Sequence, residues 1–131
     1  MKLTLIHASR AAGVFNTLGG QLLPGKIAKA VYDNRKMLMP HVEFLAEEEQ
    51  KLIRAYGAES ENGMAFHVPD DEEKNKEFIE KIADLQNVPI EILPVVIEED
   101  ALLSFARIAP NDIGFIDYIF SVDEPEGGGN E

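Results

Sequence analysis

Side chains that commonly perform catalysis or bind metal ions are few in this chain of 131 residues, and none has the spacing of a known motif. Cysteine is absent, and His7, His41 and His67 are dispersed, without the His-Glu-x-x-His spacing of a zinc-binding helix. No serine has a nucleophile-elbow context, and Gly19-Gly20 lacks the lysine of a phosphate-binding loop. An enzyme would require histidines and carboxylates to converge in the folded chain. We therefore expect a protein that is not an enzyme and has no metal ion or cofactor.

Acidic side chains form short runs at residues 47–49, 70–73 and 98–100. Such runs could attract divalent cations, but consecutive helical residues point in different directions and no calcium-loop pattern is present. We interpret the runs as solvated faces, two of which could also contact a basic protein partner. The candidate partner-binding residues are Glu47, Glu48, Asp70, Asp71, Glu72 and Glu73.

The charge of the chain is unevenly distributed around a formal net charge of −12. Residues 1–40 contain six basic residues and one acid, Asp33, which gives +5. Residues 41–131 contain six basic and 23 acidic residues, which gives −17. A negative field repels phosphates and can steer the acidic part toward a basic partner. The charge therefore favours a protein partner over nucleic acid, for which only the basic residues of the first 40 offer a surface.

Length and composition indicate one folded domain, because 131 residues with 45% hydrophobic side chains can bury a single core. No run reaches the roughly 18 apolar residues of a membrane span, and no basic segment precedes an apolar stretch at the start. We expect one domain over residues 1–122, located in the cytoplasm and not crossing a membrane, and a flexible acidic tail over residues 123–131.

The strongest local pattern is a long amphipathic helix that begins at Leu23-Pro24-Gly25 and ends at Tyr56, before Gly57. Apolar residues recur along it at intervals of seven, at Val31, Leu38, Leu45 and Leu52. Pro40 lies inside this pattern and removes one backbone hydrogen bond. We therefore expect a kink or a break of the helix near Met39.

A second helical pattern covers residues 71–86 and has acids at its start that complement the helix dipole. The intervening residues 57–69 contain an Asn62-Gly63 turn signal and a short alternating strand at 64–68. The two helices pack most simply antiparallel. The sequence thus predicts a helical-hairpin arm over about residues 24–86.

Shorter elements flank this arm. Residues 2–6 alternate as a short strand, and residues 7–18 follow a helical repeat. Residues 88–97 are rich in β-branched side chains and predict one strand bent, or two strands separated, at Pro94.

The last helix is expected to begin at Ala109-Pro110-Asn111-Asp112, whereas residues 98–109 give no structural prediction. Its expected buried side consists of Ile113, Ile116, Ile119 and Phe120. The predicted fold is α+β, a long antiparallel helical hairpin with a small β-sheet and short flanking helices.

The order of several segments is also informative. These are Lys-Leu-Thr-Leu at 2–5, Leu-Pro-Gly-Lys-Ile-Ala-Lys-Ala at 23–30, Lys-Leu-Ile-Arg-Ala-Tyr-Gly at 51–57, Val-Pro-Ile-Glu-Ile at 88–92 and Ala-Pro-Asn-Asp at 109–112. Over about residues 2–120 the chain resembles a family of small tailed-phage and prophage proteins, a domain of unknown function. Pro40 and the acidic tail depart from the family pattern. The resemblance implies a phage context and no catalytic residues.

We therefore expect a bacteriophage accessory protein that binds another protein through the hairpin, in the host cytoplasm or the virion. A virion or assembly factor would bind phage structural proteins, whereas an inhibitor of host defence would bind one host protein through its acidic half. A homo-oligomer is compatible with either role, because a hairpin covers only part of its apolar stripe. The alternative is a nucleic-acid-binding phage regulator that uses the basic N-terminal helices.

Overall fold

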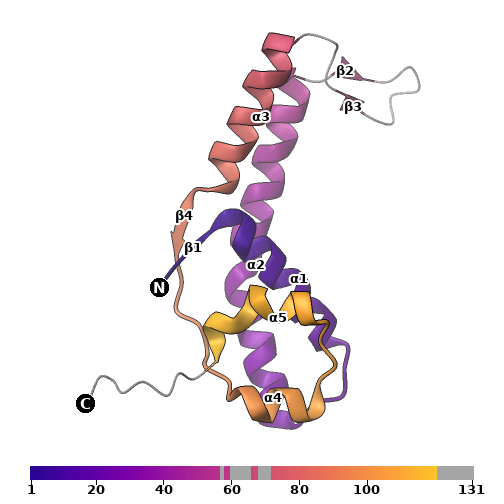
Figure 1. Ribbon diagram of the computed structural model, residues 1–131, viewed down its shortest axis with the longest axis vertical. Helices are drawn as coiled ribbons and strands as arrows, with labels where there is room; N and C mark the ends of the chain where they lie inside the picture. The colour runs from indigo at the N-terminus through magenta and orange to yellow at the C-terminus, as the bar shows by residue number, and fades with distance from the viewer. Residues whose placement is uncertain (57, 60–65, 68–71, 121–131) are drawn as a thin grey trace. The chain divides into compact units, whose positions relative to one another are not determined.

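A computed structural model describes residues 1–56, 58–59, 66–67 and 72–120 of the chain. The protein is mainly helical, with one long helix and short antiparallel strands, which agrees with an α+β class (Figure 1). The helices are α1 (Leu5–Gly19), α2 (Gly25–Tyr56), α3 (Glu72–Gln86), α4 (Glu99–Phe105), α5 (Pro110–Ile116) and the 3-10 helix η1 (Asp117–Ile119). The strands are β1 (Lys2–Thr4), β2 (Ala58–Glu59), β3 (Phe66–His67) and β4 (Pro89–Glu91).

The chain divides into two compact units, each assembled from segments that are far apart in the sequence. Unit 1 comprises Met1–Ser9 and Leu38–Ile92, and unit 2 comprises Arg10–Met37 and Leu93–Glu131. Helices α1 and α2 each contribute residues to both units. The expectation of one domain over residues 1–122 stays a prediction, and the expected tail lies outside the described residues.

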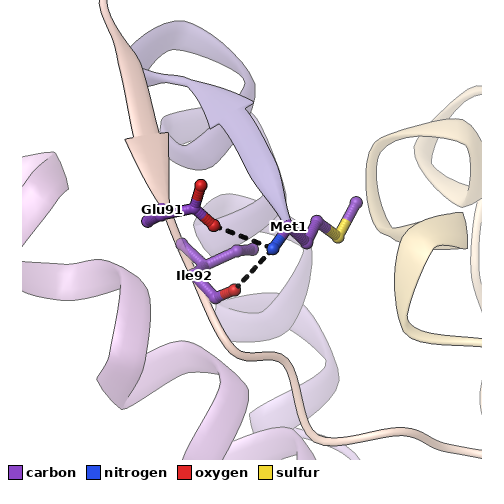
Figure 2. A network of polar contacts seen from close by, with 3 residues as sticks. All are labelled: Met1, Glu91 and Ile92. Carbon is purple, nitrogen blue, oxygen red and sulfur yellow. Dashed lines mark hydrogen bonds and ion pairs between the residues drawn. The ribbon is translucent and has the colours of Figure 1, made fainter.

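Unit 1 contains the antiparallel pair of β1 and β4, in which Leu3 lies opposite Ile90. The α-amino group of Met1 extends this pairing, because it donates to Glu91 Oε2 at 2.9 Å and to the Ile92 carbonyl at 3.3 Å (Figure 2). The predicted strand is present but ends at Thr4, whose Oγ1 accepts a hydrogen bond from the His7 amide at 3.2 Å. This bond satisfies an amide of the first turn of α1, so the helix begins at Leu5, two residues before the predicted start.

In the same unit, the C-terminal part of α2 lies beside α3 (Figure 1). Tyr56 at the end of α2 donates a hydrogen bond to Glu77 Oε1 near the start of α3, at 2.7 Å. Gln86 at the end of α3 donates to Glu49 Oε2, further back along α2, at 3.3 Å. The order of these contacts is reversed between the two helices, as in antiparallel packing.

The predicted seven-residue repeat of α2 faces inward along most of its length. Val31, Leu38 and Leu45 are buried, whereas Leu52 is only half-buried. Of the two alternatives expected at Pro40, a break is wrong, since α2 runs without interruption from Gly25 to Tyr56. Strands β2 and β3 pair antiparallel, and the Asn62-Gly63 turn predicted between them lies outside the described residues.

Unit 2 contains the larger core. Its fully buried side chains include Phe15 and Leu18 of α1 and Leu102 of α4. No structure was predicted for residues 98–109, which contain helix α4 and an extended segment after it. The last helix begins at Pro110 as predicted, and Ile116, Ile119 and Phe120 are buried, whereas Ile113 is half-buried.

The predicted strand over residues 88–97 is mostly absent. Only Pro89–Glu91 form β4, residues 93–96 have no strand partner, and Ile97 forms a single parallel bridge with Phe120. The reason is visible at Asn34 of α2, whose Oδ1 accepts from the Val95 amide and whose Nδ2 donates to the Val95 carbonyl, both at 2.9 Å. A buried side-chain amide thus takes the place of a neighbouring strand.

Candidate functional site

The acidic residues predicted to bind a partner fall partly outside the described structure. Glu47 is exposed on α2, and Glu73 is exposed on α3. Glu48 is half-buried and accepts a hydrogen bond from Lys51 Nζ at 2.6 Å. Glu72 belongs to α3, while Asp70 and Asp71 lie outside the described residues. The structure therefore places Glu47 and Glu48 on one helix and does not test the set as a whole.

The helices of unit 1 also expose large apolar side chains among these acids. Phe44 of α2 is 47% exposed, and Ile79 of α3 is 65% exposed. Exposed carboxylates flank them in sequence on both helices, at Glu43, Glu47, Glu77, Glu80 and Asp84. We name Phe44, Ile79 and these five acids the acidic–apolar set. Exposed apolar side chains mark a surface that contacts another protein where they form a patch with a polar rim.

Two hydrogen bonds of these helices shift the pKa values of their donors. The hydrogen bond to Glu48 and the charge of that carboxylate raise the pKa of the Lys51 ammonium group. The hydrogen bond to Glu77 raises the pKa of the Tyr56 hydroxyl. Both donors stay protonated at neutral pH, so these shifts do not prepare an acid or base for catalysis.

Unit 2 contains a cationic site built from basic residues of the first 40, the predicted nucleic-acid surface, around an exposed aromatic ring that was not predicted. Three cations lie near the ring of Tyr32 on α2, which is itself 47% exposed. The distances to the ring centroid are 5.5 Å from Lys29 Nζ, 5.8 Å from Arg35 Cζ and 5.9 Å from Lys36 Nζ. We name these four residues the Tyr32 cluster. The spacing of three and four residues around Tyr32 was the signal in the sequence that could have identified it.

A cavity of about 110 Å³ adjoins the Tyr32 cluster and shares Tyr32 and Arg35 with it. Its remaining lining comes from the end of α1, the following loop and the start of α2, namely Leu18, Gly19, Gln21, Leu23, Ala28 and Val31. Arg35 Nη1 donates to Asn16 Oδ1 at 3.3 Å. A Cβ atom at Gly19 would lie 3.4 Å from the same nitrogen, which is an ordinary van der Waals contact.

A second cavity of about 170 Å³ lies between α1 and the segment before α5. Its lining is mainly apolar, with Thr17, Arg107 and Asp112 as its polar members. The Gln21 side chain joins the neighbouring loops, because its Nε2 donates to the Arg107 carbonyl and its Oε1 accepts from the Arg107 amide, both at 2.8 Å.

No cluster of three or more potential metal ligands occurs within residues 1–56 and 72–120 or the two short strands between them. In the same part of the chain, no helix is both long enough and apolar enough to span a membrane. Comparisons of the chain with protein-family models, curated proteins and solved structures gave no match.

Proposed function

We propose that the protein is a non-enzymatic bacteriophage accessory protein that binds another protein through a helical hairpin over about residues 24–86. The observation that carries the proposal is the exposure of Phe44 and Ile79 among carboxylates on α2 and α3. Full burial of such side chains contributes about 1.5–3 kcal/mol each, so a partner that covers them gains affinity. The surrounding acids would favour a partner with a basic surface.

The α2–α3 pair supports binding of a partner because the apolar residues of α3 are incompletely buried. Phe78, Ile82 and Leu85 of α3 are all half-buried, and no side chain within residues 46–56 or 73–91 is fully buried. The ring of Phe78 packs against Tyr56 with centroids 6.1 Å apart. A partner protein or a second copy of the chain could cover what remains exposed.

The phage setting of the proposal comes from the family resemblance of the sequence. Within that setting two roles are open. A virion or assembly factor would bind tail or capsid proteins, and an inhibitor of host defence would bind a single host protein in the cytoplasm. The two roles predict different partners and different salt sensitivity, because an interaction dominated by exposed acids weakens as ionic strength rises.

The experiment is a pull-down with the tagged full-length chain from phage-infected host cells at two salt concentrations, followed by mass spectrometry. Recovery of phage structural proteins would identify the assembly role. One host protein that is retained at low salt and lost at high salt would identify the inhibitor.

Matched substitutions make this test specific for the acidic–apolar set. Ile79→Ser should remove the captured protein, whereas Leu22→Ser, at a 99% exposed leucine of unit 2, should retain it. A partner that binds both variants equally would contradict the use of the α2–α3 surface. A chain that captures nothing above the untagged background would contradict the accessory function itself.

A nucleic-acid-binding regulator is the second candidate function, and the Tyr32 cluster is the observation that favours it. Cations around an exposed aromatic ring are typical of surfaces that bind nucleic acid. Retention of labelled DNA that weakens with added salt would support this candidate.

A further inference from the structure

The ring of Tyr32 is accessible although three cations lie near it. Their distances of 5.5 to 5.9 Å from the ring centroid are close to the limit of about 6 Å for a cation–π interaction. At an exposed site that attraction is weak, and the side chains of lysine and arginine are long and flexible. A planar ligand can therefore replace a cation on the ring while the displaced group turns toward the ligand's negative charge.

The cluster is not neutralised by its surroundings. Within the described part of the chain, the one ion pair of the cluster joins Lys29 Nζ to Asp33 Oδ1 at 2.6 Å. Asp33 is also the sole acid among residues 1–40. The Debye length is about 8 Å at physiological ionic strength, so an acid opposes a negatively charged ligand strongly only when it lies within about that distance of the ligand. The three cations and Asp33 together have a formal charge of +2, in a protein of net charge −12.

The adjoining cavity limits the size of the group that can enter. Its volume of about 110 Å³ is below the roughly 150 Å³ of an engineered cavity that holds benzene. It is therefore too small to enclose a whole cofactor. Arg35 lines the cavity, belongs to the Tyr32 cluster and donates a hydrogen bond to Asn16. It therefore provides a charged donor where the cavity meets the cluster.

We propose that the Tyr32 cluster binds single-stranded nucleic acid, with one base stacked on Tyr32 and adjacent phosphates bound by the surrounding cations. This inference rests on the second candidate function. It adds that the nucleic acid is single-stranded and that a base stacks on Tyr32. The bases of a duplex stack on one another, so their faces are closed to a protein ring, whereas a single strand presents free faces. Cations alone would bind both forms, but an exposed ring at their centre favours the single strand.

The test measures fluorescence anisotropy of a labelled oligodeoxythymidine of about 15 nucleotides with the full-length chain. A duplex of the same length and the mononucleotide dTMP are compared with it. We expect the single strand to bind more tightly than either. Three phosphate contacts predict that the logarithm of the association constant falls with the logarithm of salt concentration at a slope of about −2.

Substitutions at the ring separate stacking from charge. Tyr32→Ala should weaken binding of the single strand about tenfold or more, while Tyr32→Phe, which keeps the ring, should stay within about twofold. Phe105→Ala is the matched control, because Phe105 is a 57% exposed aromatic residue of the same unit outside the cluster. It should leave binding unchanged.

Three results would overturn the inference. Equal binding of single strand and duplex, unaffected by Tyr32→Ala, would refute base stacking but leave the nucleic-acid regulator standing. Displacement of the oligonucleotide by polyglutamate at equal charge concentration would show that the cluster recognises charge alone. Failure of both DNA probes to bind at low salt would refute the inference together with the second candidate function.

Discussion

The two parts of helix α2 belong to different units and differ in charge and burial. Residues 25–37 contain four basic side chains and Asp33, and they bury Asn34 completely. Residues 38–56 contain four glutamates and two basic side chains, and Leu45 is their last fully buried residue. One continuous helix therefore presents a cationic surface in unit 2 and an acidic, partly uncovered surface in unit 1.

The difference between the two units indicates which of them mainly stabilises the fold and which mainly binds a partner. Most fully buried side chains belong to unit 2, whereas α3 in unit 1 contributes none within its described residues. A helix that is only half-buried keeps apolar surface available for a partner. We therefore expect substitutions in unit 2 to act mainly on folding, and substitutions of exposed residues in unit 1 to act mainly on binding.

The largest effect is expected at Phe15, which is fully buried in unit 2. Phe15→Ala should lower the free energy of unfolding by about 3–5 kcal/mol, because it removes buried apolar surface and leaves a cavity. Phe78→Ala, at a half-buried ring of unit 1, should cost about 1–2 kcal/mol. Urea unfolding of both variants measures the difference. Equal losses would refute the proposed division between the units.

The next effect concerns two side-chain amides that bind backbone in unit 2. Asn34 is 0% exposed and also donates to the Ala30 carbonyl at 3.0 Å, in addition to its two bonds with Val95. Asn34→Ala should destabilise the protein by about 2–4 kcal/mol, since the backbone groups of Val95 lose their partner. Gln21→Ala removes the equivalent pair of bonds at an exposed place and should cost about 0.5–1 kcal/mol. Thermal unfolding measures both losses. A larger loss of stability for Gln21→Ala than for Asn34→Ala would contradict the role of burial.

Alkaline pH should destabilise the protein through Tyr118 of unit 2, where burial raises the pKa of the hydroxyl above its ordinary value of 10.0. The folded state then holds the proton more tightly than the unfolded state. The resulting stability is complete below about pH 10 and decreases as the pH rises above it. Tyr56 in unit 1 contributes in the same direction through its bond to Glu77.

Urea unfolding at about pH 7 and about pH 11 measures this dependence. Tyr118→Phe should reduce the loss between the two pH values more than Tyr56→Phe does. The comparison uses the change with pH, which is independent of any constant effect of either substitution. If Tyr118→Phe leaves the loss of stability at alkaline pH unchanged, the Tyr118 hydroxyl is not its cause.

The smallest effect is expected for one ion pair in each unit. Lys51–Glu48 and Lys29–Asp33 have the same N–O distance of 2.6 Å, and both lysine side chains are 69% exposed. Solvent and salt weaken such pairs, so Lys51→Gln and Lys29→Gln should leave the urea midpoint unchanged within error. Lys29→Gln should nevertheless weaken binding of the single-stranded probe, which would separate its role in binding from its role in folding.

Local patterns in the sequence predicted α1, α2, α3 and α5, but not α4. The repeat of α2 and the stop before Gly57 located its C-terminus, and Pro110 located the start of α5. These signals depend on residues within one or two turns of each other. The positions of Glu47 and Glu48 on α2 could be predicted for the same reason, whereas their binding of a partner stays a prediction.

Long-range contacts account for the predictions that were wrong or missing. The β-branched residues before Ile97 predicted a strand, but Asn34, some 60 positions earlier in the chain, supplies the hydrogen bonds that a neighbouring strand would have formed. The cavity beside Tyr32 depends in the same way on Leu18 and Gly19, which belong to another helix. The periodicity of a single segment cannot predict contacts between residues that are far apart in the sequence.

By itself, the sequence determined the helical periods, the capping positions and the asymmetry of charge, because each depends on residue types within a short window. Tertiary structure decided which amide binds Val95, which cations surround an accessible ring beside a cavity, and which apolar residues of α2 and α3 stay uncovered. These outcomes require particular side chains from different segments to occupy the same space, and burial then fixes their hydrogen bonds.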